Sequence, residues 1–78
     1  MSNANFVIHA ACNAVLSCEL QERIPPLGRR ISFESLRKVW QTYGDPIFGL
    51  ALQALEQKGV IYVLGIDRVY LADPRPKA

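Results

Sequence analysis

A chain of 78 residues, half of them hydrophobic, makes one small domain near the lower size limit for independent folding. That hydrophobic content excludes a disordered chain, and two cysteines are too few for a disulfide framework. The net charge of +2 is too small to identify a nucleic-acid ligand by itself. Residues 6–20 are apolar but carry several polar side chains, so we expect a cytoplasmic protein without a membrane segment.

The first predicted element is a helix over about residues 4–23, with Asn3 or Asn5 available to cap its start. A narrow polar stripe follows it at four-residue spacing, formed by Asn5, His9, Asn13 and Ser17. Most of the remaining circumference is apolar, whereas a helix that packs on one side only shows a wider polar face. This helix is therefore either the central helix of a small domain or one that also packs on a second subunit.

A break at residues 25–28, Pro-Pro-Leu-Gly, is followed by a predicted short strand at residues 29–31. Ser32 is the expected cap of a second helix. The buried side of that helix is predicted to hold Phe33, Leu36, Val39 and Trp40. Arg37 and Lys38 fall on its outer side.

A turn at residues 41–44 leads into a third helix, which Asp45 can cap and in which Pro46 suits the first position. Three- and four-residue spacing predicts a buried face made of Phe48, Ala51, Leu52 and Leu55. Lys58 and Gly59 end the helix, because a cation suits its negative terminus and a glycine readily adopts a left-handed conformation.

Two β-rich runs follow at residues 60–64 and 69–71, on either side of Gly-Ile-Asp at residues 65–67. Pairing Leu64 with Arg68 makes that segment a three-residue loop. The same register places Ile61 opposite Leu71, Tyr62 opposite Tyr70, and Val63 opposite Val69.

Two stretches of this pattern resemble winged helix-turn-helix proteins. They are residues 31–36, Ile-Ser-Phe-Glu-Ser-Leu, and residues 52–61, Leu-Gln-Ala-Leu-Glu-Gln-Lys-Gly-Val-Ile. The resemblance covers about residues 31–78. It implies an α+β fold of three helices with a small two- or three-stranded antiparallel sheet.

The same resemblance divides a single domain, residues 1–78, into its parts. The helix-turn-helix falls at about residues 32–58 and the wing hairpin at about residues 60–72. The strand at residues 29–31 is then expected to add to the edge of the wing hairpin. Residues 73–78 are predicted to form a flexible tail.

The predicted core takes inward-facing apolar residues from every element. It consists of Ile8, Val15, Leu36, Trp40, Phe48, Leu52, Leu55, either Ile61 or Tyr62, and either Tyr70 or Leu71. If Trp40 is fully buried, its indole N–H needs a hydrogen-bond acceptor.

Catalytic and metal chemistry is hard to build from this sequence. The single histidine, His9, has no acidic partner nearby in sequence, and neither a glycine-rich phosphate loop nor a nucleophile elbow is present. Cys12 and Cys18 are six residues apart, so on one helix they point in different directions and cannot form a disulfide. We expect a protein that is not an enzyme, in which both cysteines act as small hydrophobes, with no bound metal and no cofactor.

In DNA-binding winged helices the third helix enters the major groove, and its outer positions are usually polar or basic. The matching positions here are Pro46, Ile47, Gly49, Leu50, Gln53 and Ala54. Only Gln53 among them carries a hydrogen-bonding side chain, so we expect salt-sensitive phosphate contacts with little base readout. The resemblance implies a small transcriptional regulator that binds double-stranded DNA through Arg29, Arg30, Arg37, Lys38, Gln53 and Arg68.

A protein-interaction module is the alternative interpretation. Ile47, Leu50 and Ala54 would form an exposed apolar strip on the third helix, with Gly49 permitting close approach of a partner or of a second copy. A homodimer through the first helix would match the two-fold symmetry of regulator binding sites. Ile47→Lys should preserve or improve DNA binding, unless it disrupts an apolar base contact, but it should abolish complex formation through the strip, so this substitution separates the two interpretations.

Overall fold

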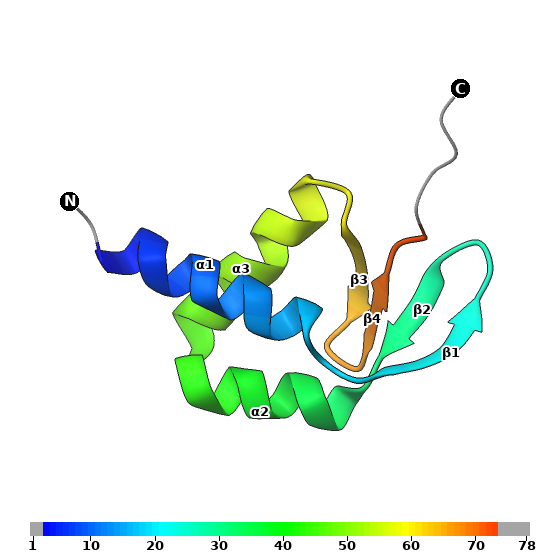
Figure 1. Cartoon of the computed structure of the whole chain (residues 1–78), viewed down its shortest axis with the longest axis horizontal. Coiled ribbons are helices and arrows are strands. Elements are labelled where there is room, and N and C mark those ends of the chain that lie inside the picture. Colours follow the sequence, from blue (N-terminus) through cyan, green and yellow to red (C-terminus); the bar gives the residue numbers. More distant parts are fainter. Residues whose placement is uncertain (1–2, 74–78) are drawn as a thin grey trace.

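The computed structural model describes residues 3–73, which form three helices and a four-stranded antiparallel sheet, an α+β arrangement. The helices are α1 (Asn3–Leu16), α2 (Phe33–Tyr43) and α3 (Asp45–Gln57). The strands are β1 (Leu20–Ile24), β2 (Gly28–Ile31), β3 (Ile61–Gly65) and β4 (Arg68–Leu71), in the sheet order β1-β2-β4-β3. The helices gather at one side of the molecule and the sheet at the other (Figure 1).

The first helix is shorter than predicted, because α1 ends at Leu16 and not near Arg23. Ser17 bonds back onto the helix, since its backbone N–H and its hydroxyl both donate to the carbonyl of Asn13, at 3.0 and 2.8 Å. The following residues form β1, which pairs with β2 across a short turn. Although the apolar spacing of Leu20–Ile24 suits a helix, pairing with the nearby strand β2 makes this segment a strand.

The polar stripe of α1 faces solvent. Its exposed members are Asn5, His9, Asn13 and Ser17, while Ala11 and Val15 are buried on the opposite side. Asn5 lies within α1 and is therefore not its cap, while Asn3 is the first residue of the helix that the structure describes. None of the helices within residues 3–73 combines the length and the apolar character needed to cross a bilayer.

The sheet has four strands where two or three were predicted, and the strand that was not predicted is β1. The predicted strand at residues 29–31 is confirmed as β2, and it adds to the hairpin as expected. Its cross-strand pairs are Arg29 with Leu71 and Arg30 with Tyr70. The pairing of β1 with β2 is irregular between Leu20 and Arg23, and the exposed residues there are Gln21, Glu22 and Arg23.

An ion pair links β1 to Asp73, a residue just beyond the end of β4. Arg23 Nε donates to the Asp73 carboxylate at 2.9 Å, and Arg23 Nη2 lies 2.7 Å from the same oxygen. The hydrogen bond, with the charge attraction, raises the pKa of the Arg23 guanidinium. Asp73 is the first residue of the predicted tail, and residues 74–78 lie outside the described residues.

The start of α2 agrees with prediction and the start of α3 does not. The Ser32 hydroxyl accepts the backbone N–H of Ser35 at 3.4 Å, as a helix cap does. Gly44, not Asp45, occupies the cap position of α3. The Asp45 carboxylate accepts the indole N–H of Trp40 instead, because the short turn brings that donor within reach.

The end of α3 is confirmed at Lys58 and Gly59. Gly59 has a φ of +74°, a conformation that suits glycine. Its N–H donates to the carbonyl of Glu56, and the N–H of Val60 donates to the carbonyl of Leu55, both at 3.0 Å. These two bonds satisfy the last carbonyls of the helix and turn the chain into β3.

The predicted register of the β3–β4 hairpin is right except next to the turn. The confirmed pairs are Ile61 with Leu71, Tyr62 with Tyr70, and Val63 with Val69. Gly65, and not Leu64, lies opposite Arg68. Leu64 is therefore an extra residue in β3, a bulge of the kind that bends a strand, and the turn shortens to Ile66 and Asp67.

Most predicted core residues are buried, namely Val15, Leu36, Phe48, Leu52, Leu55, Ile61 and Tyr70. Ile8 and Trp40 were also predicted to lie in the core, and both are half-buried. Trp40 packs against the buried cluster, whereas Ile8 is not part of it. Ala11, Ile31 and Val69 are buried without having been predicted. Ile31 and Val69 each follow an arginine in a four-residue strand, which is too short to display a clear alternation.

We expect Gly28→Ala to lower the free energy of unfolding by about 3 kcal/mol or more. Gly28 has a φ of +121°, and an added Cβ would lie 2.1 Å from the backbone oxygen of Leu71. Gly49→Ala is the matched control, because nothing lies within 4 Å of its added Cβ, and we expect a gain of about 0.5–1 kcal/mol. Urea denaturation measures both, and an unchanged midpoint for Gly28→Ala would contradict the close approach of β2 to β4.

Candidate nucleic-acid interface

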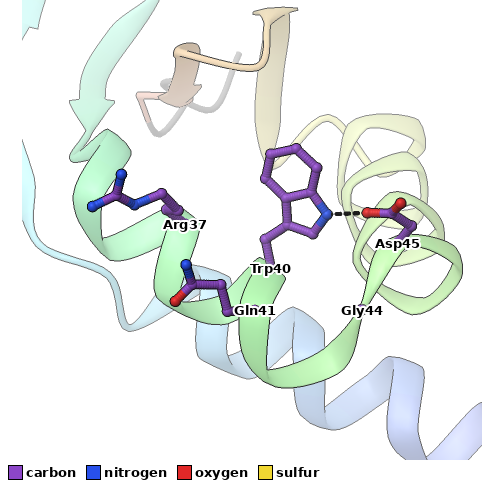
Figure 2. Close-up of a pocket in the computed structure, with 5 residues that line it drawn as sticks. All are labelled: Arg37, Trp40, Gln41, Gly44 and Asp45. Carbon is purple, nitrogen blue, oxygen red and sulfur yellow. Dashed lines mark hydrogen bonds between the residues drawn. The ribbon is translucent and has the colours of Figure 1, made fainter.

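An open depression lies at the junction of α2 and α3, with a volume of about 530 Å³. Its lining residues are Arg37, Trp40, Gln41, Gly44 and Asp45. In Figure 2 the indole of Trp40 rises from α2 beside Asp45, with Arg37 on its other side. The depression therefore combines an aromatic surface with one cation and one carboxylate.

Trp40 connects α2 to α3 through two contacts. Its ring stacks on Phe48, with centroids 5.7 Å apart and planes inclined by 10°. Its Nε1–H donates to Oδ1 of Asp45. Trp40 is half-buried, so its indole N–H has an acceptor although part of the ring remains at the surface. These contacts give the depression a fixed wall.

The predicted cations of the second helix are exposed. Arg37 lines the depression, and Lys38 lies about 100° further round α2 and is also exposed. Asp45 adds a negative charge on the α3 side of the same depression. Arg37 and Lys38 are therefore available to an external anion, while the floor of the depression itself is of mixed charge.

Arg30 and Arg68 come together at the turn between β3 and β4. Arg30 Nη2 donates to the backbone oxygen of Asp67 at 3.4 Å, and the next residue, Arg68, is exposed. Arg30 Nε is buried and has no hydrogen-bond partner among residues 3–73. Arg29 is separated from this pair, because neighbouring strand residues point to opposite faces and its Nε donates to the Gln21 carbonyl at 3.1 Å.

The outer surface of α3 is only partly open. Gly49, Leu50 and Gln53 are exposed, whereas Ile47 and Ala54 are half-buried. The first helix, α1, packs against α3. A shallow depression between the two helices is lined by Ile8, Leu50, Gln53, Ala54 and Gln57. Leu50 remains 46% exposed. The predicted apolar strip is thus narrower than expected and centred on Leu50.

Both thiols donate to backbone carbonyls. Cys12 Sγ lies 3.6 Å from the oxygen of Ala51, across the contact between α1 and α3, and Cys18 Sγ lies 3.4 Å from the oxygen of Ala14. Burial raises the pKa of the Cys18 thiol, which lowers its reactivity. In the part of the chain that the structure describes, His, Cys, Asp and Glu side chains form no group of three or more suited to a metal.

Sequence reasoning did not assign Gln41, Gly44 or Asp45 to a site. Gln41 and Gly44 were expected to serve only as a turn, and Asp45 as a cap. The available signal was the short spacing from Trp40 to the first acidic residue after the turn, which brings an indole donor and a carboxylate together. Leu64 and Ile66, which precede Arg68 in the chain, are also exposed. The sequence did not assign either residue to a site.

No family model, curated protein or solved structure matches the chain. The class of protein must therefore be argued from the fold and from the exposed residues. These define a small α+β domain with cations on α2 and at the β3–β4 turn, and with apolar residues exposed on α3 and at the same turn.

We expect Asp45→Asn to lower the free energy of unfolding by about 1 kcal/mol or less, because the exposed acceptor of the Trp40 indole loses its charge. Trp40 is the single tryptophan of the chain, so its fluorescence emission should also shift. Glu56→Gln makes the same chemical change at an exposed position of α3 and should alter neither quantity. An emission spectrum identical to that of the wild type would argue against the indole–carboxylate bond.

Proposed function

We propose that this chain is a small DNA-binding protein of the winged helix-turn-helix class that acts as a transcriptional regulator. In this proposal α2 and α3 are the helix-turn-helix, and the β3–β4 hairpin is the wing. Contacts to the phosphate backbone supply most of the affinity, and base contacts supply little. The regulatory role follows from the resemblance of residues 31–78 to that family.

The observation that carries the proposal is the bond from Arg30 to the backbone of Asp67. It joins the wing turn to the strand that leads directly into α2, so the wing and the start of α2 lie at the same end of the sheet. A duplex that crosses this end would meet cations from both elements.

The proposed phosphate-binding residues are Arg30, Arg37, Lys38 and Arg68. Gln53 is exposed on α3 and is the proposed base-edge contact, since an amide pairs well with adenine. Arg29 is left out of this set, because it bonds to β1 on the opposite face of the strand. The sequence of α3 contains no lysine or arginine, which is why we expect weak base readout.

The double variant Arg37→Ala/Lys38→Ala should weaken binding to a mixed-sequence duplex. It should also reduce the slope of log affinity against log salt by about 2, because two phosphate contacts are lost. Gel shifts over a salt series measure both quantities. Arg23→Ala/Lys58→Ala removes the same charge elsewhere and should leave the slope nearly unchanged. The absence of any shift at low salt, with wild-type protein, would refute DNA binding.

A protein-interaction module is the second candidate, and the exposure of Leu50 favours it. Leu50 is 46% exposed in a shallow depression whose other apolar residues are Ile8 and Ala54. Apolar side chains that lie open beside a hollow are typical of docking surfaces. Dimerisation through α1 remains a further proposal, supported by the exposure of Phe6 and Leu16 on that helix.

Leu50→Lys should separate the two candidates. The half-buried Ile47 is less suitable for this test, because a cation there would be partly withdrawn from water and could destabilise the fold. If α3 faces DNA, the added cation should preserve or raise affinity in the gel shift. If α3 docks on protein, the same variant should abolish self-association measured by sedimentation, and neither the wild type nor the variant should shift the duplex. Circular dichroism should match the wild type in either case.

A further inference from the structure

The depression at the junction of α2 and α3 exposes part of a tryptophan ring. One face of the Trp40 indole stacks on Phe48. The ring surface that Phe48 leaves uncovered lines the depression (Figure 2). The volume of about 530 Å³ lies within the range of small-molecule sites. An aromatic surface is therefore open beside a hollow large enough for a flat ligand.

The charged side chains around this ring are of both signs. Arg37 lies on one side of the indole and Asp45 on the other (Figure 2). Just outside the depression on α2, Glu34 precedes Arg37 by nearly one turn, and Lys38 is the residue after it. The two positive and two negative charges cancel, so net charge favours neither an anion nor a cation. The depression suits a ligand that carries an anion at one end and hydrogen-bond donors at the other.

The polar groups of the depression retain hydrogen-bonding capacity for a ligand. Within residues 3–73 the only ion pair joins Arg23 to Asp73, so the exposed Arg37 guanidinium has no carboxylate partner there. The Asp45 carboxylate accepts the indole N–H through Oδ1. An ionised carboxylate has about four lone-pair sites, so Asp45 can accept further donors. Gln41 is exposed and adds an amide at the rim.

We propose that this depression binds a guanine nucleotide, either free or as an unpaired residue of a single strand. The base stacks on the uncovered part of Trp40, and its phosphate pairs with Arg37. Asp45 accepts N–H groups of the Watson–Crick edge of the base. Guanine presents two adjacent N–H donors on this edge, whereas adenine presents one donor beside an acceptor that a carboxylate repels.

Other ligand classes leave part of the depression without a partner. An apolar aromatic ligand would use the indole but would satisfy neither Arg37 nor Asp45. A basic peptide side chain would meet Asp45 but would be repelled by Arg37. Bases inside a duplex are stacked on both faces, so they cannot also stack on Trp40 unless they are first extruded. The inference therefore stands apart from the proposed function, because it requires neither a wing nor a duplex.

The test is a calorimetric titration of the whole chain with guanosine monophosphate, accompanied by tryptophan fluorescence. Trp40 is the single tryptophan, so a base that stacks on it should quench the emission. Guanosine monophosphate should bind about tenfold more tightly than adenosine monophosphate, and about tenfold more tightly than guanosine, which lacks the phosphate.

A second titration distinguishes the two sources of the nucleotide. It uses a short thymidine strand with one central guanine, and an all-thymidine strand of equal length as the reference. If the guanine strand binds no more tightly than guanosine monophosphate, the ligand is a free nucleotide. If it binds about tenfold more tightly than both the mononucleotide and the reference strand, the ligand is an unpaired guanine of a nucleic acid.

Two substitutions test the two ends of the ligand separately. Arg37→Ala should weaken guanosine monophosphate about tenfold and keep the affinity for guanosine within about twofold. Asp45→Asn should remove the preference for guanine over adenine, because an amide is both donor and acceptor. Lys58→Ala and Glu56→Gln are the matched controls, since they change charge in the same way at exposed positions outside the depression. Neither control should alter either affinity, and circular dichroism checks that each variant is folded.

Three results would overturn the inference. They are no binding of guanosine monophosphate or of the guanine strand at millimolar ligand, equal binding of guanine and adenine nucleotides, and binding unchanged in both Arg37→Ala and Asp45→Asn. None of these measurements contains a duplex, so such a result leaves the proposed function standing. Conversely, a missing gel shift with duplex DNA would refute the proposed function and leave the nucleotide site untouched.

Discussion

Burial of one face of α3 is the interaction on which the other elements depend. The side chains on that face are Phe48, Ala51, Leu52 and Leu55, and the helix contacts α1, α2 and β3. Each large apolar side chain contributes roughly 1.5–3 kcal/mol when it is fully buried, more than a typical single hydrogen bond contributes. The positions of the α2–α3 junction and of the hairpin follow from this packing, because both are joined to α3 by short connections.

The sequence predicted well those features that local chemistry controls. Ser32 as a cap, Gly59 as a helix end and the pairing of Tyr62 with Tyr70 all follow from interactions between residues close in sequence. The errors share a different cause. β1 was assigned to a helix because its stability comes from β2, and Asp45 was assigned to a cap because Trp40 competes for its carboxylate. The three- and four-residue spacing of apolar residues does not reveal a strand pairing or a side-chain hydrogen bond of this kind.

The sequence predicted which charged residues of the candidate site are exposed, but it did not predict how they are arranged in space. Exposure of Arg37 and Lys38 follows from helical periodicity, and the structure agrees. The separation of Arg29 from Arg30 depends on which face of β2 each residue occupies, and a short strand beside an unrecognised partner hides that choice. The width of the apolar strip on α3 depends on how α1 crosses it, which no local pattern in either helix specifies.

The two outermost strands of the sheet differ in a way that bears on solubility. β1 carries exposed Gln21, Glu22 and Arg23 and pairs irregularly with β2, and such charged, distorted margins resist the addition of a foreign strand. β3 has no charged residue, but it lies against α3 for part of its length. The two margins of the sheet therefore differ, because β1 presents charged side chains and irregular pairing, whereas β3 is uncharged and contacts α3.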